Sequence, residues 1–173
     1  MPPLHEIAGY EVISKLGDGA RSSIYAVKDR KGQIYALKRV ERKVEADQRF
    51  LDQAVGEHKI AKQFDHPTLR KSFKLTRVGW PFKVTEVLVL MEMVDGTTLE
   101  EHHPTKMTEL CDIFKRVAQG LSVMHEAGYV HADIKPKNIL LTDKDQIKII
   151  DFGQSCAIGT IKERIQGTPD YIA

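Results

Sequence analysis

The stretch that decides the fold of this 173-residue chain reads VHADIKPKN over residues 130–138. It places an acid, a lysine and an amide within six positions, as Asp133, Lys135 and Asn138. Pro136 fixes its own φ angle and keeps the preceding residue out of the helical region. We therefore expect a stiff loop that holds its polar side chains in place.

Two short apolar segments, 139–141 and 147–150, follow this loop and are predicted to pair as strands around a tight turn. A hairpin brings the outer ends of its two strands together. Asp151 stands just after the second strand, so it should lie close to Asn138 and Asp133. Two carboxylates and an amide supply the oxygen atoms that magnesium and its phosphates require.

The segment HADIKPKN (131–138), followed by Asp-Phe-Gly at 151–153, resembles the catalytic and metal-binding loops of eukaryotic-type protein kinases. The resemblance implies an α+β, protein-kinase-like fold. Such a fold has a small antiparallel-sheet lobe with one long helix, here joined to the beginning of a mainly helical large lobe. It divides the chain into an N-lobe (1–91), a hinge (92–96) and a partial C-lobe (97–173).

The composition fits a globular protein. Hydrophobic residues make up 42% of the chain and charged residues 29%, and the net charge is only +2. This balance argues against nucleic acid as a partner, and no apolar run reaches the roughly 20 residues of a membrane helix. Cys111 and Cys156 are far apart and are expected to be reduced thiols, so we expect a cytoplasmic protein.

Near the N-terminus, residues 1–9 look like an irregular lead-in, and 10–16 and 23–27 look like paired strands. The turn between the strands contains Gly17 and Gly19, which allow a close backbone approach to a phosphate. The hairpin resembles the kinase glycine-rich loop, with Ser22 in place of the third glycine. Taken alone, this segment would be read as an ordinary hairpin turn.

Lys38 lies inside a third predicted strand (33–40), and Glu57 lies on a predicted helix (47–63). A lysine in mid-strand usually faces solvent, whereas a buried one needs a counter-charge. By resemblance, Lys38 contacts the α- and β-phosphates of ATP and pairs with Glu57. Gly56 should weaken the helix by roughly 1 kcal/mol relative to alanine. Two reasons for a glycine there stay open, namely mobility of the helix and a packing requirement.

Two further strands are expected at 73–78 and 84–91, and the apolar run 87–91 predicts burial on both faces. The resemblance places Met91 beside the adenine pocket and makes 92–94 the hinge proper. The residues that the resemblance assigns to ATP are Leu16, Gly17, Gly19, Ile24, Ala36, Lys38, Met91, Glu92, Val94, Leu140 and Asp151.

A short helix is predicted over 98–103 and a longer one over 108–127, with Thr108 as its cap and Gly128 at its left-handed end. Residues 154–166 read as a polar loop. The apolar stripe of the longer helix consists of Leu110, Ile113, Phe114, Val117, Leu121 and Met124, and Cys111 is also expected in the core. By resemblance, His131 is structural and packs near Phe152.

The resemblance also implies the chemical roles. Asp133 is the catalytic base, Lys135 neutralises the γ-phosphate, and Asn138 and Asp151 hold Mg²⁺. Lys135 and Thr168 point to a protein serine or threonine as the acceptor, and hence to an ATP-dependent protein serine/threonine kinase. The alternatives are an ATP-binding pseudokinase scaffold and a small-molecule kinase on a related fold.

Two departures from the family pattern qualify these expectations. Ala132 replaces the arginine that in the family pairs with an activation-segment phosphate, so activity should not depend on phosphorylation of Thr160 or Ser155. The chain also spans only the first two-thirds of such a domain. We therefore expect a fragment of a longer protein, or a second half that is marginally folded because the 147–150 strand and the long helix lack packing partners.

Overall fold

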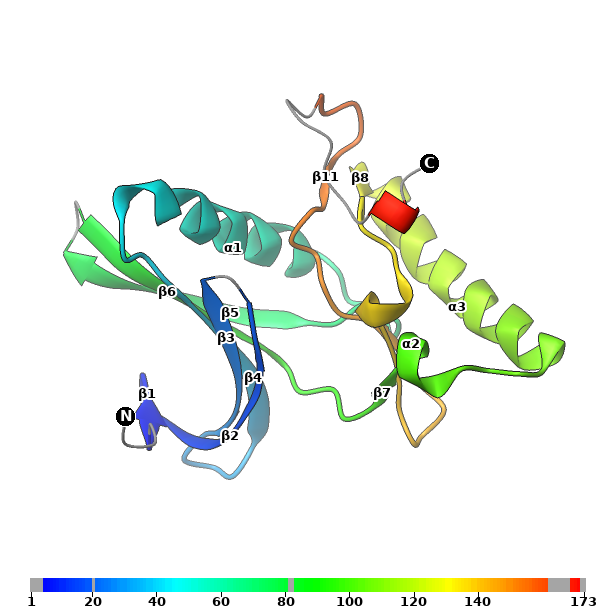
Figure 1. Ribbon diagram of the computed structural model, residues 1–173, viewed down its shortest axis with the longest axis horizontal. Coiled ribbons are helices and arrows are strands. Elements are labelled where there is room, and N and C mark those ends of the chain that lie inside the picture. Colours follow the sequence, from blue (N-terminus) through cyan, green and yellow to red (C-terminus); the bar gives the residue numbers. More distant parts are fainter. Residues whose placement is uncertain (1–4, 20, 81–82, 162–168, 172–173) are drawn as a thin grey trace. The chain divides into compact units, whose positions relative to one another are not determined.

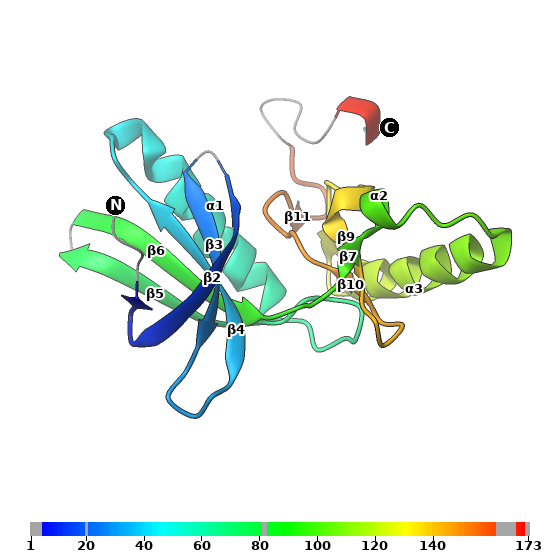
Figure 2. The ribbon, with the colours of Figure 1, turned by 60° about the horizontal axis from the view of Figure 1, so that its bottom comes forward.

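The computed structural model describes residues 5–19, 21–80, 83–161 and 169–171. Figures 1 and 2 show the chain from two directions. It folds as two compact units, which are described separately. The first unit comprises Met1–His58 and Ser72–Met93, and the second comprises Lys59–Lys71 and Val94–Ala173.

The first unit is built on a six-stranded antiparallel sheet with the order β1-β2-β3-β4-β6-β5. Its strands are β1 (Glu6–Ile7), β2 (Tyr10–Asp18), β3 (Ser22–Lys28), β4 (Ile34–Glu41), β5 (Ser72–Trp80) and β6 (Lys83–Glu92). The helix α1 (Gln48–Ala61) packs on this sheet and follows a 3-10 turn at Glu45–Asp47 (Figure 1). The predicted antiparallel sheet with one long helix is confirmed.

Each face of the sheet has its own apolar core. Leu51 and Ala54 of α1 pack with Val40, Val87 and Val89 on one face. The opposite face carries a second cluster made of Ile7, Tyr25, Val27, Leu37, Leu88 and Leu90. The side chains of β6 alternate between these two clusters, so the apolar run 87–91 is buried on both sides as predicted.

The second unit combines two helices with short strands. The helices are α2 (Leu99–His102) and α3 (Met107–Glu126). The strands are β7 (Thr97–Thr98), β8 (Tyr129–Val130), β9 (Ile139–Leu141), β10 (Ile147–Ile149) and β11 (Cys156–Ala157). They form a three-stranded sheet, β10-β9-β7, and a two-stranded ladder, β11-β8. In the described part of the unit, 3-10 turns lie at Pro136–Asn138 and Pro169–Tyr171.

One buried cluster holds the second unit together. Ile113, Val117 and Met124 of α3 pack with the buried strand residues Ile139 and Ile149. The hairpin of β9 and β10 pairs Ile139 with Ile149, which aligns the outer ends of the two strands as predicted. Ile149 is fully buried, so the expectation that the 147–150 strand lacks packing partners is wrong.

Several local expectations are wrong as well. The lead-in contains the strand β1, which turns back on β2 through Ala8 and Gly9, both at positive φ. The strand β2 continues to Asp18, inside the predicted turn. The predicted polar loop after Gly153 contains β11, because Cys156 and Ala157 pair with β8.

The long helix α3 also differs from its prediction. It begins at Met107 after Lys106, so Thr108 lies inside the helix and is not its cap. Phe114 is 56% exposed and Cys111 is exposed, although both were expected in the core. Gly128 has a φ of +82° after the helix, as predicted. Both cysteines are free thiols. Within the described ranges, every helix is too short or too polar to pass through a lipid bilayer.

Candidate functional site

An ion pair links the sheet and the helix of the first unit. Nζ of Lys38, on β4, lies 2.5 Å from Oε2 of Glu57, on α1. Glu57 is only 4% exposed, and the side chain of Lys38 is 19% exposed. Burial makes an unpaired charge costly, so this pair fixes the helix against the strand. The structure thus brings together the lysine and the glutamate that the sequence singled out.

The glycine-containing hairpin lies at the joined ends of β2 and β3. Gly17 is opposite Ile24, and a bulge falls between Lys15 and Gly17. The amide of Gly19 donates to the carbonyl of Ser22 at 2.7 Å. A Cβ at Gly19 would lie 2.7 Å from Oγ of Ser22, so a larger residue there would require the Ser22 hydroxyl to shift.

The apolar residues expected around an adenine differ in burial. Ala36 and Met91 are cross-strand neighbours on β4 and β6, and both are buried. Ile24 packs beside them in the same cluster, whereas Leu16, at the bulge, is 47% exposed. Glu92 ends β6 in the first unit. The remaining two, Val94 and Leu140, belong to the second unit, where Leu140 lies on β9.

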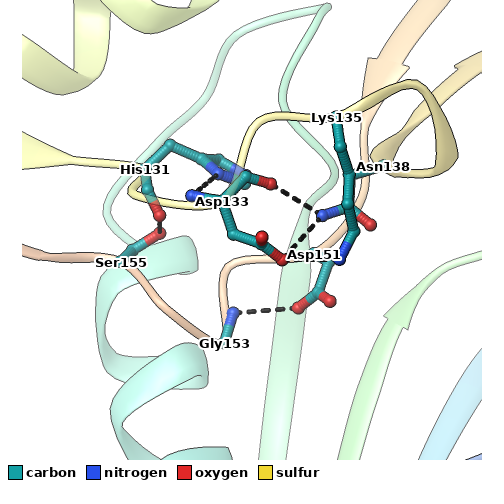
Figure 3. A network of polar contacts seen from close by, with 7 residues as sticks. All are labelled: His131, Asp133, Lys135, Asn138, Asp151, Gly153 and Ser155. Carbon is teal, nitrogen blue, oxygen red and sulfur yellow. Dashed lines mark hydrogen bonds and ion pairs between the residues drawn. The ribbon is translucent and has the colours of Figure 1, made fainter. Parts of the chain in front are cut away.

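The second unit gathers the polar side chains of residues 131–155 in one small region (Figure 3). The ammonium of Lys135 lies 2.9 Å from Oδ2 of Asp133. The amide nitrogen of Asn138 donates to the main-chain carbonyl of Asp133 at 2.8 Å and to its Oδ2 at 3.3 Å. Pro136 starts the 3-10 turn that carries Asn138 back toward Asp133. Asp133 is thereby held between a cation and an amide.

Asp151 joins this group through the strand hairpin. The amide of Ile150 donates to the carbonyl of Asn138 at 3.0 Å, which places Asp151 directly beside Asn138. Gly153 donates its amide to Oδ1 of Asp151 at 2.9 Å and so orients the carboxylate (Figure 3). The carboxylate of Asp151 and the amide oxygen of Asn138 are hard donors that fit magnesium. Among the described residues, no group of three or more His, Cys, Asp or Glu side chains is arranged to hold a metal ion.

His131 contacts the loop that carries Asp133. It is buried, and its ring centroid lies 5.5 Å from that of Phe152, as the sequence predicted. Nδ1 of His131 accepts a hydrogen bond from the amide of Asp133, and the main-chain carbonyl of His131 accepts one from Ser155. Burial lowers the pKa of His131 to about 4, although Asp151 and Asp133 act in the opposite direction. The imidazole is therefore neutral near pH 7.

Two contacts of these segments were not predicted. Ser155 binds the main chain at His131, and Arg21, at the hairpin tip, forms an ion pair with Asp47. Arg21 and Asp47 are 26 positions apart, and no local pattern marks such a pairing. Thr168, which the sequence associated with the acceptor, lies outside the described residues.

Comparison with known proteins agrees with these features. A family model described as protein kinase domain matches residues 10–173. The chain is similar to mitogen-activated protein kinase kinase 9 of Arabidopsis thaliana, with 37% identity over 150 residues, which are 84% of this chain and 46% of that protein. It is also similar to Aurora kinase of Saccharomyces cerevisiae, with 33% identity over 171 residues, covering 95% of this chain and 45% of that protein.

A bacterial relative extends the comparison. A probable serine/threonine-protein kinase of Streptomyces coelicolor is 31% identical over 175 residues, covering 95% of this chain and 26% of that protein. The chain thus spans less than half the length of each of these curated relatives.

Proposed function

This chain belongs to the protein kinase domain family, and we propose that it transfers the γ-phosphate of ATP to a serine or threonine hydroxyl of a protein. The observation that carries this proposal is the arrangement around Asp133, whose carboxylate is held by Lys135 and Asn138. Relatives named as serine/threonine-protein kinases support the choice of acceptor.

The roles follow from what each group can do chemically. Asp133 accepts the proton of the attacking hydroxyl, because its carboxylate is fixed and mostly buried. Lys135 balances the negative charge that develops on the phosphoryl group during transfer. These are contributions of placement and charge, which are most of what phosphoryl transfer asks of a protein.

The proposed nucleotide contacts are the residues that the family pattern assigns to ATP. Lys38, fixed by Glu57, binds the α- and β-phosphates, and the backbone at Gly17 and Gly19 covers the phosphates. Asn138 and Asp151 would hold Mg²⁺, which neutralises phosphate charge when it is bound. The proposed walls of the adenine pocket are Leu16, Ile24, Ala36, Met91 and Leu140, with backbone contacts at Glu92 and Val94.

We further propose the domain limits of the family for this chain. Residues 1–91 are the N-lobe, 92–96 the hinge and 97–173 the part of the C-lobe that is present. In the structure, β6 ends at Glu92 and β7 begins at Thr97, so the proposed hinge is the connection between two strands.

One assay tests the proposed activity. We would measure phosphate transfer from radiolabelled ATP with Mg²⁺ to a generic protein substrate, for the wild type, Asp133→Asn and Lys38→Met. Matched controls are Asp143→Asn and Lys59→Met, which make the same chemical changes at exposed positions. We expect each site variant to lose at least about 100-fold in rate and each control to keep the wild-type rate.

The remaining outcomes are equally informative. Transfer that survives both Asp133→Asn and Lys38→Met would contradict the assigned site. ATP binding by the wild type without transfer would instead identify a nucleotide-binding scaffold. Phosphorylation of a small molecule but of no protein would contradict the proposed acceptor.

A further inference from the structure

The tip of the β2–β3 hairpin is tied by an ion pair to the segment that leads into α1. Nε of Arg21 donates to Oδ1 of Asp47 at 2.8 Å. Arg21 lies between Gly19 and the start of β3, and Asp47 is the last residue before α1. The two elements that carry the glycine loop and Glu57 are therefore joined by a side-chain contact that the sheet itself does not supply.

Asp47 is built into the fold. The residue is only 4% exposed, and its two carboxylate oxygens accept hydrogen bonds from different groups. Oδ2 accepts the amides of Lys43 and Val44, at 3.0 and 3.1 Å, which fixes the turn before the helix. Oδ1 is left for Arg21, whose hydrogen bond is the main reason that the pKa of Asp47 lies below its usual range. A buried carboxylate needs such a cation, and Arg21 supplies it.

The main chain of Arg21 is anchored as well. Its carbonyl accepts the amide of Glu41 at 3.1 Å, at the end of β4. A cavity of about 190 Å³ lies next to this anchor and is lined by Arg21, Ser22, Lys38 and Phe50, among others. Arg21 and Lys38 thus border the same space. A shift of the hairpin tip would change the surroundings of Lys38.

From this geometry we propose that Arg21 and Asp47 form a positioning pair, which sets the hairpin tip relative to α1 and thereby tunes ATP affinity. Fixing the N-terminal end of a helix restrains the whole rigid element, including Glu57 farther along α1. The ion pair restrains the hairpin before ATP binds, so less conformational entropy is lost when the phosphates of ATP bind. The consequence for ATP rests on the proposed function, whereas the restraint itself does not.

The chemistry of Asp47 allows a clean substitution. Asp47→Asn keeps an oxygen for the amides of Lys43 and Val44 but presents an NH₂ group to Arg21, so it removes the ion pair and keeps the turn. Arg21→Ala removes the same ion pair from the other side. Lys15→Gln is the control, because Lys15 pairs with Asp18 at 2.6 Å within the same hairpin and does not reach α1.

The restraint is measured first, without nucleotide, by residue-resolved hydrogen exchange of the full chain. The reporters are the amides of Gly19 and Glu41, whose acceptors are the carbonyls of Ser22 and Arg21. Arg21→Ala and Asp47→Asn should each speed exchange at both amides by about fivefold, and the double variant should add nothing further. Lys15→Gln should leave both rates unchanged. Unchanged exchange in the two pair variants, or additive effects, would overturn the pairing.

The affinity for Mg²⁺-ATP is measured next, by calorimetry. The dissociation constant should rise about fivefold in Arg21→Ala and in Asp47→Asn, again without further loss in the double variant. Arg21→Lys should recover part of the affinity, since it restores the charge. Faster exchange with unchanged ATP affinity would refute the link to nucleotide binding. If the wild type binds no ATP, the proposed function fails, and the exchange data alone decide whether the pair restrains the hairpin.

Discussion

The ring of His131 packs on the ring of Phe152, with centroids 5.5 Å apart and planes inclined by 51°. Both side chains are almost fully buried in the second unit. This contact places a titratable group beneath the loop that carries Asp133 and beside Asp151. Because burial favours the neutral imidazole, the loop depends on a histidine that stays uncharged.

The first prediction concerns pH and His131. Burial lowers its folded-state pKa from 6.5 to about 4, so the unfolded chain binds a proton that the folded chain does not bind between these values. The unfolding free energy should therefore fall as the pH drops from 6.5 to 4, by about 3 kcal/mol from this group. Urea titrations at several pH values would measure the slope.

His131→Phe should flatten that slope, since phenylalanine keeps the ring contact and cannot be protonated. His125→Asn is the control, because His125 is exposed near the end of α3. The neighbouring charges are Asp151, Asp133 and Lys135, and they remain in both variants. An equal pH slope in wild type and His131→Phe would show that the imidazole is not the responsible group.

The second prediction separates the pairing of Lys38 and Glu57 from their burial. Lys38→Met leaves the 4%-exposed carboxylate of Glu57 without its ammonium partner and should destabilise the protein by roughly 3 kcal/mol. Lys38→Met combined with Glu57→Leu should recover most of that loss, because no buried charge remains. Denaturant unfolding of the two single variants and the double variant measures the coupling. A double variant less stable than Lys38→Met would mean that the buried carboxylate is satisfied by other groups.

Much of the fold and of the candidate site could be read from the sequence, because the deciding signals are local. Pro136, the tight turn after Leu141 and the short apolar segments of β9 and β10 act within a few residues, so the position of Asn138 beside Asp151 follows from them. The continuously apolar run of β6 predicted burial on both faces for the same reason.

The errors arise where longer-range packing decides. Phe114 and Cys111 lie on a helix whose apolar stripe is broad, and the periodicity does not say which part of the stripe a neighbour covers. The strands β1 and β11 have two residues each, too few for any alternation to appear. The pair of Arg21 and Asp47 joins positions that only the folded sheet brings together.

The third prediction contrasts two glycines. A Cβ at Gly56 in α1 meets nothing within 4 Å, so this glycine has no packing role. Gly56→Ala should raise the unfolding free energy by about 0.5–1 kcal/mol, through the lower conformational entropy of the unfolded chain. A Cβ at Gly96 would overlap the main-chain carbonyl of Leu141, so Gly96→Ala should cost roughly 1–3 kcal/mol. Denaturant melts would reveal opposite signs, and equal signs would contradict the described surroundings of one glycine.

The fourth prediction concerns Thr160 and rests on Ala132. Ala132 holds a φ of +61° next to Asp133 and offers no group that could bind a phosphate. The hydroxyl of Thr160 donates to the carbonyl of Ala157 at 2.7 Å. The side chains of Thr160 and Ala132 are both uncharged. We therefore expect Thr160→Ala and Thr160→Asp to keep the transfer rate within about twofold of the wild type, because less than ~0.5 kcal/mol should be at stake. Rates would be measured on protein treated with phosphatase and on untreated protein. Loss of activity in Thr160→Ala, restored by Thr160→Asp, would show that a cation elsewhere in the protein replaces the missing arginine.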